Sequence, residues 1–227
     1  DYEWVSSEEA EIYNSAFLLQ PHESEIQRYH KLKLVPMSEK VPFSEQWPFL
    51  YRLAKKMDLD IGNFVPGDSA VVFNLPLGEQ GRQTRFSVMI CYDSVFPELG
   101  RAFTGRGAEF LVIITNDGWF GKTSGPLQHA QYAILRAIET RRWIARCANT
   151  GISEFVDPSG TIISRTPLYR EAVLTEKIGT RTDRTFFVRM GNSLYNGLLF
   201  IALLIGVLSF PLRLKRPPSG PNGGGRR

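Results

Sequence analysis

Two short apolar runs, separated by a helix-length segment, constrain the fold of this chain more than any other feature. Residues 86–91 (FSVMIC) and 110–115 (FLVIIT) have the composition of buried strands, and residues 97–105 between them have the length of a short helix. Residues 127–142 carry apolar side chains at near-helical spacing. The order strand, helix, strand, helix predicts an α/β domain built on a layered sheet.

The flanking sequence extends this pattern on both sides. Before it, we expect a strand over 13–19 and a helix over 47–57. After it, residues 143–147, 152–156 and 161–164 are expected to be strands, and the DPSG sequence at 157–160 predicts a turn. With 227 residues, of which 43% are apolar, the chain can form one domain with a sizeable core.

Residues 194–212 form an uncharged run of nineteen residues. As a helix it would be about 28 Å long, close to the roughly 30 Å of a bilayer core. Tyr195 lies near one end, and Arg213, Lys215 and Arg216 follow the other, as at membrane interfaces. We therefore predict a folded domain over 1–190, a transmembrane helix over 191–213 and a basic, disordered cytoplasmic tail over 214–227. The alternative is a buried core helix, but residues 198–208 lack a polar stripe.

Charge and cysteine content argue against several classes of function. The chain has 27 Lys and Arg against 23 Asp and Glu, but five of the basic residues follow Leu212. The remainder is near neutral, which does not favour a nucleic-acid-binding surface. Cys91 and Cys147 are expected to be free thiols, Cys147 in the core. The three histidines are scattered along the sequence, and Asn116 and Asp117 are expected to form a turn. We therefore predict no metal site and no cofactor.

Cys91 ends the first predicted strand and precedes the sequence YDSVFP. A thiol at this position is exposed above a sheet, where backbone N–H groups favour a thiolate and a developing oxyanion. The alternative is a buried structural cysteine. The surrounding motifs favour the reactive interpretation.

Three motifs occur in order: YHKLKLVP at 29–36, CYD at 91–93 and ITNDGWFG at 114–121. Together with PLQH, RAIE, ANTGI and TFFVRMG further on, they resemble the nitrilase, or carbon-nitrogen hydrolase, superfamily. Within it, the chain is similar to the carboxy-terminal part of the apolipoprotein N-acyltransferase family. This resemblance implies a nitrilase-like αββα sandwich, incomplete on its amino-terminal side, followed by the membrane helix.

The resemblance also assigns roles by position. Cys91 matches the nucleophile and Lys31 the lysine that stabilises the oxyanion, with Lys33 as a solvated neighbour. Glu39 matches a glutamate that positions the catalytic groups. The substrate-binding positions are expected to be Tyr92, Asp93, Trp119 and Phe120. The family usually has Glu where this chain has Asp93, so the contact made by that residue is expected to differ.

The glutamate that acts as general base in this family lies further before the lysine than the 30 residues available here. Glu3, Glu8, Glu9 and Glu11 are expected to form a solvated face instead. We therefore expect the chain to be part of a longer enzyme and inactive alone.

The resemblance implies acyl transfer from a phospholipid through a Cys91 thioester to the α-amine of a diacylglyceryl-cysteine lipoprotein. The enzyme is expected to act as a monomer in the bacterial inner membrane, with its catalytic domain outside the cytoplasm and its carboxy terminus inside. Two alternatives remain open: an amidase or nitrilase with the same Glu-Lys-Cys chemistry, and a non-catalytic membrane-anchored module.

Overall fold

A computed structural model describes residues 2–4, 10–21, 23–57, 59, 61–77 and 81–214 of the chain. The chain divides into two compact units, Asp1–Arg189 and Met190–Arg227. Most of the predicted tail, and Glu8 and Glu9 of the amino-terminal acidic run, lie outside the described residues.

The first unit is built on a mixed sheet whose strand order is β10-β9-β8-β7-β6-β5. The three central strands, β6, β7 and β8, are parallel, and antiparallel pairs complete the sheet on either side. The strands of this sheet are β5 (Phe73–Leu77), β6 (Arg82–Ile90), β7 (Phe110–Asn116), β8 (Ile144–Asn149), β9 (Glu154–Val156) and β10 (Ile162–Arg165).

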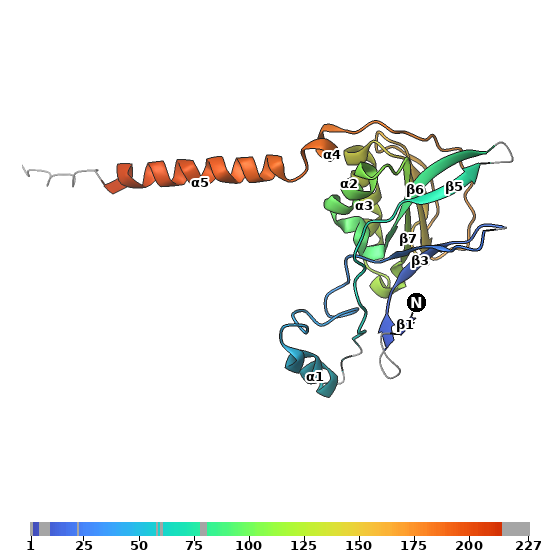
Figure 1. Ribbon diagram of the computed structural model, residues 1–227, viewed down its shortest axis with the longest axis horizontal. Coiled ribbons are helices and arrows are strands. Elements are labelled where there is room, and N and C mark those ends of the chain that lie inside the picture. Colours follow the sequence, from blue (N-terminus) through green and yellow to red (C-terminus); the bar gives the residue numbers. More distant parts are fainter. Residues whose placement is uncertain are drawn as a thin grey trace, which may run out of the picture. The chain divides into compact units, whose positions relative to one another are not determined.

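Two helices provide the crossovers between the parallel strands. Helix α2 (Pro97–Gly105) connects β6 to β7, and α3 (Gly125–Thr140) connects β7 to β8. The two helices pack together on one face of the sheet (Figure 1), as expected for successive right-handed crossovers in one direction. The predicted alternation of strands and helices is confirmed. Strand β6 begins earlier than predicted because its polar start, from Arg82, pairs with β5.

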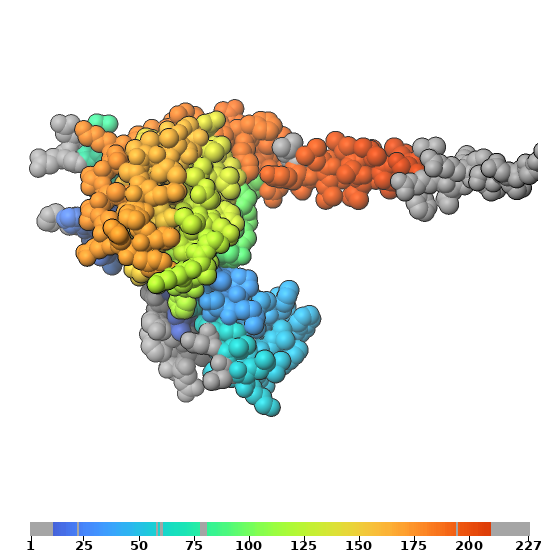
Figure 2. Space-filling view, turned by 180° about the vertical axis from the view of Figure 1, so that it is seen from behind, coloured from blue at the N-terminus to red at the C-terminus, as the bar shows by residue number. Residues whose placement is uncertain are grey.

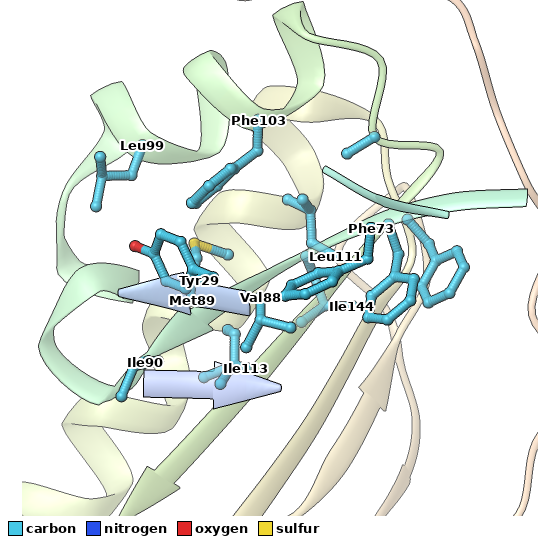
Figure 3. Close-up of a cluster of buried hydrophobic side chains, with 14 of the residues drawn as sticks. Tyr29, Phe73, Val88, Met89, Ile90, Leu99, Phe103, Leu111, Ile113 and Ile144 are labelled. Atoms are coloured by element: carbon cyan, nitrogen blue, oxygen red, sulfur yellow. The ribbon is translucent and has the colours of Figure 1, made fainter. Parts of the chain in front are cut away.

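The core lies between the sheet and these helices (Figure 3). Met89, Leu111 and Ile113 of the central strands and Phe103 of α2 are fully buried. Tyr29 enters the same cluster and meets the Phe103 ring edge to face, with ring centroids 5.5 Å apart. Tyr29 thereby anchors its strand, β4, to the core.

A hairpin of β3 (Ser15–Leu18) and β4 (Gln27–His30) carries Tyr29, and a second small hairpin pairs β1 (Tyr2–Trp4) with β2 (Ala10–Ile12). After β4, residues 31–64 form a lobe, blue to cyan in Figure 2, that contains α1 (Pro48–Lys56). The lobe exposes large apolar side chains, among them Phe43, Trp47, Phe49 and Leu53.

Helices α4 (Phe186–Met190) and α5 (Ser193–Leu214) follow the sheet domain. The large apolar side chains of α5 from Tyr195 to Leu208 are exposed. Among the described residues, no helix reaches the combined length and hydropathy of a membrane span, so the predicted transmembrane helix is not confirmed.

The two cysteines are free, as predicted, but the core position expected for Cys147 is wrong. Along β8, Ile144 and Arg146 are buried while Cys147 is exposed. Successive side chains of a strand point to opposite faces of the sheet. Cys147 therefore lies on the face opposite Arg146, and apolar composition alone does not distinguish the two faces.

Candidate active site

Cys91 occupies the turn between the central strand β6 and helix α2. It is the first residue of a single 3₁₀ turn, η1 (Cys91–Val95), and its backbone has φ of 49°. This left-handed conformation is strained for a residue other than glycine. The turn lifts the residue off the sheet, and Cys91 remains half-buried.

Lys31 directly follows β4 and is 1% exposed. Its Nζ lies 2.8 Å from Oε1 and 2.7 Å from Oε2 of Glu39. Glu39 also accepts hydrogen bonds from the Val35 backbone N–H and from the Asn14 side chain. The loop between Lys31 and Glu39 therefore closes around an ion pair, and the ammonium is fixed in position.

Asp93 connects the Lys31 segment to the cysteine turn. Its Oδ2 accepts from the Tyr29 hydroxyl at 2.8 Å and from the Ile90 N–H at 3.1 Å, and its Oδ1 accepts from the Lys33 N–H at 2.8 Å. Tyr29 and Lys33 flank Lys31, whereas Ile90 precedes Cys91. One carboxylate thus holds the segment that carries the ammonium against the turn that carries the thiol.

Burial dominates the electrostatics of Asp93, whose side chain is completely enclosed. Desolvation raises the pKa of Asp93 above its usual value, although its hydrogen bonds and the Lys31 charge act in the opposite direction. Burial, with the nearby Asp93 charge, also raises the pKa of Tyr29. The carboxylate faces protein donors, so a contact with substrate at this position would require these bonds to open.

Lys33 and Tyr92 lie beside the same turn. Lys33 forms an ion pair with Glu98, at 3.2 Å, and its Nζ lies 4.9 Å from the centroid of the Phe96 ring. The Tyr92 ring meets Phe96 edge to face, with centroids 5.0 Å apart. Unlike Lys31, Lys33 is partly exposed to solvent, with 37% of its side chain accessible.

The two aromatic residues predicted to contact substrate lie in η2 (Asp117–Phe120), the turn after β7. Trp119 is 83% exposed and Phe120 is 40% exposed. Because β6 and β7 are parallel neighbours, this turn leaves the same edge of the sheet as the cysteine turn. The hydroxyl of Tyr169 donates to the Gly121 carbonyl and ties the end of η2 to a later loop.

A buried polar network beneath the cysteine turn was not predicted. His129 of α3 lies 3.2 Å from the Cys91 carbonyl through Nε2 and 2.8 Å from Asp117 Oδ1 through Nδ1. Arg146 of β8 donates to Asp117 Oδ2 at 2.9 Å. Asp117 is therefore more than a turn former, whereas Asn116 does form the predicted turn by accepting from the Gly118 N–H.

The sequence feature that could have predicted this network is the position of each residue relative to the parallel strands. Asp117 follows β7, Arg146 lies within β8, and His129 lies in the helix that connects these strands. Their separation along the chain made them look scattered. The described residues contain no group of three or more His, Cys, Asp or Glu side chains that could hold a metal ion.

Comparisons with known proteins agree with this architecture. The carbon-nitrogen hydrolase family matches residues 2–183. The apolipoprotein N-acyltransferase of Chlorobaculum tepidum is 41% identical over 81% of this chain and 34% of its own length. That of Geobacter metallireducens is 36% identical over 89% of this chain and 37% of its own length. The chain thus spans about a third of the length of these curated relatives.

A solved structure supports the fold assignment. A C145A mutant of the Nesterenkonia AN1 amidase, from the nitrilase superfamily, aligns with a TM-score of 0.50 and 21% identity over 81% of this chain and 61% of that one. The family match covers the whole strand–helix–strand–helix unit and the segments that carry Lys31, Cys91 and Asp117. On this basis, the chain belongs to the carbon-nitrogen hydrolase family and has a nitrilase-like α/β fold.

Proposed function

We propose that this chain carries the acyl-transfer site of a membrane-bound apolipoprotein N-acyltransferase. The observation that carries the proposal is the Asp93 carboxylate, which holds the Lys31 segment against the Cys91 turn. In the proposal, Cys91 is the nucleophile and Lys31 is the ammonium that stabilises the oxyanion. The similarity to curated acyltransferases supports the choice of reaction.

The reaction would proceed in two steps through a covalent intermediate. The Cys91 thiolate attacks the ester carbonyl of a membrane phospholipid, and a tetrahedral oxyanion forms that Lys31 and the Tyr92 N–H stabilise. Collapse of this intermediate releases a lysophospholipid and leaves an acyl thioester on Cys91. The free α-amine of a diacylglyceryl-cysteine lipoprotein then attacks the thioester, forms the amide and restores the thiol.

The remaining site residues would act around these two groups. Glu39 fixes Lys31 through both carboxylate oxygens, and Asp93 positions the two segments. The exposed Trp119 and Phe120 are placed to contact acyl chains. A glutamate general base, as the family uses, would remove the proton of the thiol.

We also propose that the exposed apolar helix α5 anchors this domain in the bilayer as a transmembrane helix over 191–213. The basic residues beyond it would lie in the cytoplasm and residues 1–190 outside it, in the periplasm of a bacterium with two membranes. An exposed apolar segment near the site, Trp119–Phe120 or residues 43–53, would then form a lid over the acyl chains. A membrane position brings both lipid substrates to one thiol.

A direct test is to incubate the full-length protein in detergent with a phospholipid whose transferred chain carries an alkyne. The expected result is a hydroxylamine-sensitive thioester on the Cys91 peptide, lost in Cys91→Ser and Lys31→Met and kept in the matched control Cys147→Ser. Adding a diacylglyceryl-cysteine peptide should move the label to its amine. Release of the chain as free acid at the same rate with and without peptide would indicate a hydrolase, and no label on Cys91 would refute covalent catalysis.

A further inference from the structure

The network beneath the cysteine turn has the geometry of a Ser-His-Asp arrangement. Ser94 Oγ lies 3.2 Å from His129 Nε2, and His129 Nδ1 lies 2.8 Å from Asp117 Oδ1. Ser94 is only 1% exposed, and its hydroxyl donates to the Cys91 carbonyl at 2.7 Å. A buried hydroxyl committed to a carbonyl is not an available nucleophile, so these three residues do not form a second hydrolytic site.

Each nitrogen of the His129 ring faces an oxygen acceptor. Nδ1 lies against the Asp117 carboxylate, and Nε2 lies 3.2 Å from the Cys91 carbonyl. The Arg146 guanidinium is also 3.2 Å from Nδ1, but it can only donate, and an unprotonated Nδ1 would place a lone pair against Asp117. In this geometry an N–H at Nε2 points to the Cys91 carbonyl, and an N–H at Nδ1 points to the Asp117 carboxylate.

The other end of the network is fixed by the sheet. Arg146 donates to Asp117 Oδ2 and, through its other terminal nitrogen, to the Ile152 carbonyl at 3.0 Å. Gly151 packs so tightly that a Cβ built on it would lie 2.2 Å from Asp117 Oδ2. Asp117 therefore has little freedom to move, and it orients the His129 ring towards the cysteine turn.

We infer that His129 is a positioning residue for the nucleophile: its Nε2–H, together with the Ser94 hydroxyl, holds the Cys91 carbonyl and keeps Cys91 in its left-handed conformation. Without these donors, the peptide after Cys91 is free to rotate, and the direction of the Tyr92 N–H changes with it. His129 touches no reacting atom in this role. The inference rests on the proposed function only in taking Cys91 as the nucleophile.

Two substitutions of His129 separate this role from simple packing. In His129→Gln, the amide nitrogen can take the place of Nε2 and keep the hydrogen bond to the Cys91 carbonyl. In His129→Asn, the amide nitrogen takes the place of Nδ1 and can keep only the hydrogen bond to Asp117. We would measure the iodoacetamide alkylation rate of Cys91 in the full-length protein by peptide mass spectrometry, with the exposed Cys147 as an internal reference. Loss of one hydrogen bond corresponds to roughly a three- to tenfold change.

The Cys91 to Cys147 rate ratio should fall roughly three- to tenfold in His129→Asn and stay within about twofold of wild type in His129→Gln. Ser94→Ala, which leaves α3 intact, should lower the ratio in the same direction and tests the inference if the asparagine variant does not fold. An unchanged ratio in folded His129→Asn, or equal losses in the asparagine and glutamine variants, would overturn the inference. Thioester formation by wild-type protein is scored separately, so a failure of acyl transfer is distinguishable from a failure of this inference.

Discussion

Replacing Asp93 should affect both the stability of the sheet domain and the geometry of the site. Its carboxylate accepts from two buried donors, the Tyr29 hydroxyl and the Ile90 N–H, and from the partly buried Lys33 N–H. Each buried donor left unsatisfied costs about 1–3 kcal/mol. Through the two buried donors, Asp93→Ala should therefore lower the free energy of unfolding by roughly 2–6 kcal/mol, a large part of the roughly 5–15 kcal/mol of a typical domain.

Asp93→Asn provides the graded comparison. Its amide oxygen can accept from Tyr29 and Ile90, but its NH2 group then faces the Lys33 N–H. One unsatisfied donor predicts a loss of about 1–3 kcal/mol. The assay is urea unfolding of the protein in detergent, followed by tryptophan fluorescence, with Glu45→Gln as a control. Glu45 pairs with Lys40 at the surface, and such a pair contributes about 0–1 kcal/mol.

The order of stability should be wild type and Glu45→Gln, then Asp93→Asn, then Asp93→Ala, with an unchanged denaturant slope. An Asp93→Ala protein within about 1 kcal/mol of wild type would refute the reasoning, because two buried donors cannot lose their acceptor at so small a cost.

Three further predictions concern the turns at the same edge of the sheet. Burial raises the pKa of Asp117, but the hydrogen bond from His129 and the Arg146 charge together outweigh it, so its pKa lies below the usual value. Its stabilisation is therefore present above about pH 4 and is lost as the pH falls through the lower folded-state pKa, and urea titrations should show less acid destabilisation in Asp117→Asn. Gly151→Ala should cost about 1–3 kcal/mol, because its methyl group meets Asp117, whereas Gly105→Ala has open space and should be neutral or stabilising; equal melting temperatures would contradict this. Finally, Cys91→Gly should be about 1 kcal/mol more stable than Cys91→Ala, because glycine relieves the left-handed backbone; the opposite order in urea unfolding would show that the turn is unstrained.

The central part of the fold was predictable because its apolar runs are short, continuous and separated by helix-length segments. Helix α2 was predicted with the bounds observed, and β7 to within one residue of its end. Strand β4 was not predicted because QRYH lacks an alternating apolar pattern, and β5 was not predicted because the proline in FNLPL argues against a strand. Their pairing depends on neighbouring strands, which local sequence does not reveal.

Contacts within one short segment could be expected from the sequence, whereas contacts between distant elements could not. The pairing of Lys31 with Glu39 joins residues only eight positions apart along the chain. His129, Asp117 and Arg146 belong to three different elements, and their chemistry is visible only after the parallel strands bring them together. Asp93 is an intermediate case. Its position in the turn after Cys91 could be predicted from the sequence, but its contacts with Tyr29, Lys33 and Ile90 could not.

The pairing of Lys31 with Glu39 has a further consequence for the physical state of the resting centre. An isolated ammonium would hold its hydration shell tightly, and displacing that water with a hydrocarbon tail would be costly. Here the Lys31 ammonium already contacts both carboxylate oxygens of Glu39. The ion pair therefore has no net charge and acts as a dipole. Under the proposed function, a hydrocarbon chain would therefore cover this pair without stripping water from a bare cation.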